Sequence, residues 1–145
     1  MSLDDWLNNS WLIPHHATKQ EITDLLSVID RDIRAASVIG LDTDWRLGIA
    51  YNACLQCAVT ALVASGYRAS RIQHHYRAIQ SLAFTMALEA SMISSLDVYR
   101  RMRNFADYER AGTIPESAAD EALHLAQTLR NLLLEWLSAQ HPELL

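Results

Sequence analysis

One arginine-rich segment, residues 99–109, holds the side chains in this sequence that are best suited to chemistry on a phosphate. If the segment is a helix, side chains three or four positions apart lie on neighbouring faces and can act together. Arginine forks, an amide and a phenol on one helix could hold a phosphodiester and stabilise charge that develops on it. The alternative is a solvated, salt-bridged face, since Arg103 and Asp107 stand at i and i+4. The candidates at this spacing are Arg100, Arg101, Arg103, Asn104, Asp107 and Tyr108.

Two adjacent histidines are a second candidate for chemistry. His74 and His75 stand early in the helix expected after Ser70, and they could serve a phosphate site only if two helices bring them near Arg103. The alternative is an ordinary hydrogen-bonded histidine. Adjacent residues on a helix point about 100 degrees apart and no carboxylate cluster accompanies the pair, so no metal site is predicted.

The cysteines Cys54 and Cys57 form a CxxC motif. A redox pair normally lies at a helix N-terminus, and a structural zinc site needs two further ligands at suitable spacing. This pair falls in the middle of an expected helix. We therefore interpret the two cysteines as small residues that let a neighbouring helix approach.

Charge is unevenly distributed along the chain. Residues 68–110 contain seven arginines and four acids, whereas the whole chain has a net charge of −5. A basic sector on an acidic protein predicts an anionic partner that meets one face, and Arg68 is a further candidate to contact it. The alternative is that these arginines pair with the acidic helices of the same chain.

Composition predicts an all-α fold. The chain has 145 residues, of which 50% are hydrophobic, with 4 glycines and 3 prolines, too few for the many turns of an all-β protein. We expect one domain, residues 1–145, built as a compact bundle of about five helices. Residues 1–17, which carry two tryptophans, are expected to form an ordered arm or short helix packed on the bundle.

Caps and apolar periodicity indicate where the helices lie. A capping box at Thr18 begins the first helix, the second runs from about Trp45 to Ser65 and is apolar nearly all round, and Ser70 is expected to cap the third. The boundary between the third and fourth helices is open, with Ser94 or Ser95 as the restart. The last helix is expected between Pro115 and Pro142.

The predicted location is the cytoplasm. No apolar run approaches the roughly 18–20 residues that a membrane span needs. The first five residues lack the basic start and apolar stretch of a signal peptide.

Several of these features resemble the HEPN superfamily of helical bundles, many of which are encoded beside nucleotidyltransferases in toxin–antitoxin modules. The resemblance is carried by Arg103-Asn104 in the penultimate long helix, and Arg103 followed by Ala-Asp-Tyr at 106–108 is similar to the pattern of one subset of HEPN-like proteins. It extends to Ala-Tyr-Asn-Ala at 50–53, Gly-Tyr-Arg at 66–68 and the histidine pair at 74–75. It implies an up-and-down bundle, a homodimer with a composite site, and metal-independent RNA cleavage.

Tyr108 departs from the HEPN pattern, because the family places a histidine there. A tyrosine with a pKa of about 10 is a poor general base at neutral pH. Tyr108 could act by hydrogen bonding, or it could receive a nucleotide from a partner transferase, as a nearby tyrosine does in HEPN toxins.

Three functions therefore remain open. The first is a binding module for nucleotide, RNA or a nucleotidyltransferase, with residues 100–108 as its binding face. The second is a metal-independent ribonuclease toxin with Arg103, Asn104 and Tyr108 at a dimer-interface site. The third is a helical scaffold without nucleic-acid contact. No cofactor is expected in any of them.

Overall fold

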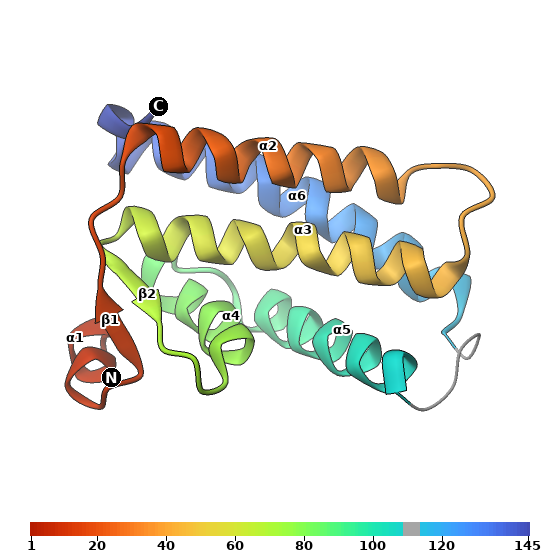
Figure 1. Cartoon of the computed structure of the whole chain (residues 1–145), viewed down its shortest axis with the longest axis horizontal. Coiled ribbons are helices and arrows are strands. Elements are labelled where there is room, and N and C mark those ends of the chain that lie inside the picture. Colours follow the sequence, from red (N-terminus) through yellow and green to blue (C-terminus); the bar gives the residue numbers. More distant parts are fainter. Residues whose placement is uncertain (109–113) are drawn as a thin grey trace.

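The computed structural model describes residues 1–108 and 114–145, with the backbone alone for residues 105–108. Within these residues it is a bundle of α-helices with one small two-stranded sheet, which confirms the all-α prediction (Figure 1). The elements are α1 (Leu3–Asn8), β1 (Leu12–Pro14), α2 (Lys19–Ala36), α3 (Thr43–Ala64), β2 (Tyr67–Ala69), α4 (His74–Thr85), α5 (Ala90–Tyr108), α6 (Glu116–Gln140) and a final 3-10 turn (Pro142–Leu144).

The long helices run in alternate directions. Figure 1 shows α2 and α3 antiparallel, α5 antiparallel to α3, and α6 returning behind them, as an up-and-down bundle requires. Buried residues from α2 to α6 form one continuous apolar core. The bundle thus brings side chains from α2, α3 and α5 to one flank.

Helix α3 is the centre of the bundle. It packs against α2, α4, α5 and α6, and its buried residues cover most of its circumference, whereas the face that carries Trp45, Asn52 and Gln56 is not buried. By length and composition it is the one described helix that could cross a membrane, but most of it is buried inside the bundle. Four helix neighbours therefore explain why most of its surface is apolar, and the face without a neighbour is the one that carries Trp45 and Asn52.

Helix α2 follows its sequence pattern closely. The side chain of Thr18 accepts a hydrogen bond from the Glu21 amide at 3.1 Å, which confirms the predicted N-cap. Ile22, Ile29 and Ala36 recur at helical spacing along α2 and are fully buried, so this apolar stripe lies on the core.

The N-terminal arm is more structured than the sequence indicated. Strand β1 pairs antiparallel with β2, with Leu12 opposite Ala69 and Pro14 opposite Tyr67. Trp6 is buried beside Leu12 and Leu62, and Arg77 of α4 stacks on Trp11 with 3.7 Å between the guanidinium carbon and the ring centroid. The arm is thus tied to the bundle by main-chain and side-chain contacts, which confirms that it packs on the body.

Two predicted helix starts are wrong. Ser70 does not cap α4, because the helix begins four residues later; the Ser70 amide donates to the Trp11 carbonyl at 2.9 Å and so extends the strand pairing. Helix α4 instead begins at His74, after Gln73 in the left-handed conformation (φ 55°). Helix α5 begins at Ala90 rather than at Ser94 or Ser95, because the left-handed Ala87 (φ 51°) ends the turn after α4.

Candidate functional site

The arginines of helix α5 differ in burial. Arg100 and Arg103 are half-buried against neighbouring helices, whereas Arg101 and Asn104 are exposed. The side chains of Asp107 and Tyr108 lie outside the described part of the chain, although their backbone belongs to α5. The predicted binding roles of these two residues therefore stay predictions. Arg100 and Arg103 are therefore the described arginines of α5 that lie against other helices.

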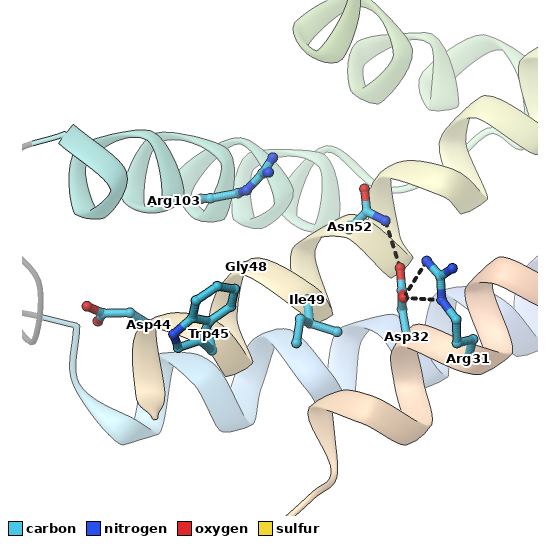
Figure 2. A pocket seen from close by; sticks show the side chains of 8 residues that line it. All are labelled: Arg31, Asp32, Asp44, Trp45, Gly48, Ile49, Asn52 and Arg103. Atoms are coloured by element: carbon cyan, nitrogen blue, oxygen red, sulfur yellow. Dashed lines mark hydrogen bonds and ion pairs between the residues drawn. The ribbon is translucent and has the colours of Figure 1, made fainter. Parts of the chain in front are cut away.

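Arg103 lines a pocket of about 360 Å³ between α2, α3 and α5 (Figure 2). Figure 2 shows Arg103 on α5, with Trp45 of α3 toward one end of the view and the Asp32–Asn52 pair toward the other. A methyl group at Gly48 would lie 3.9 Å from Arg103 Nε, so the guanidinium lies close to the α3 backbone. The lining residues are Arg31, Asp32, Asp44, Trp45, Gly48, Ile49, Asn52 and Arg103.

Asp32 and Asn52 form the polar end of this pocket. Asn52 Nδ2 donates to Asp32 Oδ2 at 2.7 Å, and Arg31 Nε donates to Asp32 Oδ1 at 3.0 Å (Figure 2). Asp32 is buried although it carries a carboxylate. Buried carboxylates require such partners, because a buried charge without one destabilises the fold. Removing one partner of a buried ion pair typically costs about 3–5 kcal/mol of stability. The hydrogen bonds hold both oxygens of Asp32 in a fixed direction.

Trp45 is the aromatic wall of the same pocket. It lies in the first turn of α3 and is 66% exposed, which is unusual for so large an apolar side chain. Its indole and the Arg103 guanidinium line one cavity. An exposed aromatic face beside a cation suits a planar anionic ligand.

Tyr51 lies near one lining residue of this pocket and one of a second pocket. The Arg103 guanidinium carbon is 5.6 Å from the centroid of the Tyr51 ring, and the His75 ring is 6.4 Å from the same ring. Tyr51 is 1% exposed, and burial raises the pKa of its phenol well above the usual value. Its hydroxyl has no hydrogen-bond partner among the described residues.

The second pocket, of about 500 Å³, lies between the start of α4 and α5. The rings of His74 and His75 meet edge to face at 4.3 Å, and the Arg100 guanidinium lies 5.4 Å from the Tyr76 ring centroid. Arg100 Nε also donates to Asp97 Oδ1 at 2.8 Å. Burial, His74 and the two guanidiniums lower the pKa of His75 from its usual 6.5. The lining residues are Gln73, His74, His75, Tyr76 and Arg100.

The structure brings together some of the predicted site residues and leaves others apart. Arg100, Arg103, His74 and His75 gather around Tyr51, so α4 and α5 do carry the histidines to the arginine helix. Arg68 does not join them, because it is exposed on β2, opposite Ile13. Arg101 pairs with Asp97 at 3.4 Å on the outside of α5, and Asn104 is exposed; neither lines the two pockets.

Sequence reasoning missed Asp32, Asn52, Tyr51 and Trp45 as site residues. Asp32 could have been found, because it interrupts the apolar stripe of α2 between Ile29 and Ala36. Trp45 gave no such signal, since a tryptophan at the start of a helix is equally compatible with burial.

The two cysteines are packing residues of α3. Cys54 and Cys57 are 1% and 0% exposed and form no disulfide. Burial raises the pKa of the Cys54 thiol to about 12 and that of Cys57 well above 9. Their interpretation as small residues at a helix interface is therefore confirmed.

Comparison with protein-family models, with curated proteins and with solved structures finds no match to this chain. The HEPN resemblance stays a prediction that rests on the residues that suggested it.

Proposed function

We propose that this chain is a nucleotide-binding helical module that holds one base and its phosphate in the pocket between α2, α3 and α5. The observation that carries the proposal is that an exposed indole, Trp45, and a guanidinium, Arg103, line one cavity. Nucleotide sites combine these two chemistries, an aromatic face for the base and a forked cation for the phosphate.

The remaining lining residues suit a base edge. Asp32 is held by Asn52 and Arg31, so its carboxylate could accept from the ring or exocyclic N–H of a base without reorienting. The cavity of about 360 Å³ lies within the range of small-ligand pockets, roughly 300–1,000 Å³.

The bound nucleotide is either free or one unit of a single strand of RNA. Single-stranded RNA is favoured by the basic sector of residues 68–110, because its seven arginines against four acids would attract a polyanionic backbone. Electrostatic attraction along a backbone and stacking of single bases are the usual way in which proteins hold such strands.

A binding titration tests the proposal. Fluorescence anisotropy of a labelled RNA oligonucleotide, with unlabelled mononucleotide as competitor, would measure affinity and distinguish the two sources. Trp45→Ala removes one stacked base, worth about 1–3 kcal/mol, so affinity should fall roughly 5- to 150-fold. Arg103→Ala should weaken binding and reduce the slope of log affinity against log salt by about 0.7.

Arg101→Ala is the matched control. It removes the same charge from the same helix, but Arg101 is exposed and lines neither pocket. Equal losses from Arg101→Ala and Arg103→Ala would show that binding is diffuse attraction, and the pocket proposal would be wrong. No binding of either ligand would favour the scaffold function, with an acidic protein as partner.

A metal-independent ribonuclease is the second candidate, and the position of His75 favours it. His75 and Arg103 both lie near the Tyr51 ring, and the Arg103 charge helps to lower the pKa of His75. The lowered pKa keeps the imidazole neutral at pH 7, the form that accepts a proton. Purified protein should then cleave RNA without metal, and Arg103→Ala and His75→Gln should each abolish cleavage. Intact RNA after incubation with the wild-type chain would exclude this function.

A nucleotidyltransferase partner, a toxin–antitoxin role, a homodimer and a cytoplasmic location remain predictions from the sequence and the resemblance. Analytical ultracentrifugation of the purified chain tests the homodimer directly.

A further inference from the structure

The second pocket, at the start of α4, shares no lining residue with the Trp45 pocket. It therefore needs an explanation of its own. Its walls carry two imidazoles, a guanidinium, an amide and a phenol, contributed by residues 73–76 and Arg100. Each of these groups can donate a hydrogen bond, and none of them is a carboxylate.

The charges around His75 come from three helices. On its own helix lie His74 and Tyr76, on α3 lies Tyr51, and on α5 lie Arg100, Arg103 and Asp97. Asp97 is the acid of this set, and it is engaged by both Arg100 and Arg101. With both imidazoles protonated, the pocket would hold three cations against one carboxylate that is already shared between two arginines.

We infer that this pocket is a binding site for a phosphate monoester, which it holds most tightly when His74 and His75 are protonated. The phosphate dianion offers three acceptor oxygens, and a guanidinium with two imidazoliums offers matching charge-assisted donors. The volume of about 500 Å³ leaves space for the organic group of the ester. The inference stands apart from the proposed function, because the ligand here is recognised by its phosphate and no base is required.

Proton uptake should be coupled to anion binding. Without an anion, burial and the neighbouring cations lower the pKa of His75. A dianion in the pocket reverses the sign of that local field and raises the pKa. By linkage, each unit of increase means that the protonated chain binds the anion about tenfold more tightly than the neutral chain does.

Sulfate is the probe that isolates the histidines, because it stays a dianion across the whole range from pH 5 to 8. NMR would follow the ring-proton signals of the six histidines as a function of pH, with and without sulfate. The pKa of His75 should rise by about one to three units on sulfate addition, as expected for an opposite charge within hydrogen-bond range. His124, exposed on α6, is the internal control and should not shift.

Two variants make the test specific. Arg100→Gln removes the guanidinium and should abolish the sulfate-induced shift of His75, whereas Arg34→Gln, an exposed arginine on α2, should leave it intact. His74→Gln changes an exposed ring and should reduce the shift without unfolding the chain.

Inorganic phosphate and a simple sugar phosphate, run in the same experiment, distinguish a free anion from an ester. A larger shift with the ester supports a monoester site, and a shift with inorganic phosphate alone would overturn that assignment. If sulfate moves His75 and His124 equally, or moves neither, the site does not exist. Sulfate carries no base to stack on Trp45, so the sulfate experiment does not test the nucleotide pocket. Failure of the anion site and failure of the nucleotide proposal are therefore distinguishable.

Discussion

Replacing Tyr51 with phenylalanine should stabilise this protein, which is the reverse of the usual effect of a substitution in the core. Tyr51 is 1% exposed, yet its hydroxyl has no hydrogen-bond partner among the described residues. Folding therefore strips water from this hydroxyl without returning a hydrogen bond. Phenylalanine keeps the ring and removes the group that bears this cost.

The magnitude follows from the desolvation of one buried polar group, about 1–3 kcal/mol. For a chain of this length, each kcal/mol raises the melting temperature by roughly 2–4 °C, so Tyr51→Phe should melt about 2–12 °C higher. The ring also remains in place beneath Arg103, and a phenylalanine face attracts a guanidinium as a tyrosine face does. Nucleotide affinity should therefore stay unchanged.

Urea unfolding followed by circular dichroism is the assay, with equal slopes required for a valid comparison of midpoints. Tyr76→Phe is the control, because Tyr76 is exposed and its hydroxyl reaches water, so its effect should stay within about 0.5 kcal/mol. If Tyr51→Phe loses stability by more than the control does, the Tyr51 hydroxyl is hydrogen-bonded in the protein and the reasoning fails.

Two further predictions concern titrating groups inside the bundle. The thiolate is the reactive form of cysteine, and burial raises the pKa values of both thiols. Cys54 and Cys57 should therefore resist a thiol reagent in the folded protein and react fully in denaturant. Fast labelling without denaturant would contradict this. The pKa of His75 is lowered by folding, so the unfolded chain binds more protons below about pH 6.5 and stability should fall as pH decreases through that value. Urea midpoints in buffer without sulfate or phosphate should show this loss, and His75→Gln should reduce it; an unchanged pH dependence in the variant would assign the loss to other groups.

Local features of the fold were predictable because the forces that set them act within one helical turn. The Thr18 cap and the buried stripe of α2 follow from residues three to four positions apart. The centrality of α3 followed from its all-round apolar surface, and the burial of Cys54 and Cys57 confirms it.

The β1–β2 pair could not be read from local pattern. Each strand is three residues long, and residues 12–14 pair with residues 67–69 from a distant part of the chain. That pairing also bears on the wrong prediction for Ser70, because the hydrogen bond from its amide to Trp11 extends the strand pairing to residue 70, and α4 begins only at His74. A capping residue is only a local preference, and a main-chain hydrogen bond to a distant residue overrides it.

The candidate site shows the same division. The sequence by itself determined that Arg100 and Arg103 lie one turn apart on a helix, and that His74 and His75 open another. Only the tertiary structure decided that Arg103 lies beside Trp45 and the Asp32–Asn52 pair, while Arg100 lies beside the histidines. Helical periodicity sets which side chains share a face, but it carries no information about which other helix that face meets. That choice is made by the packing of the whole core around α3, which brings both Arg103 and His75 near the Tyr51 ring.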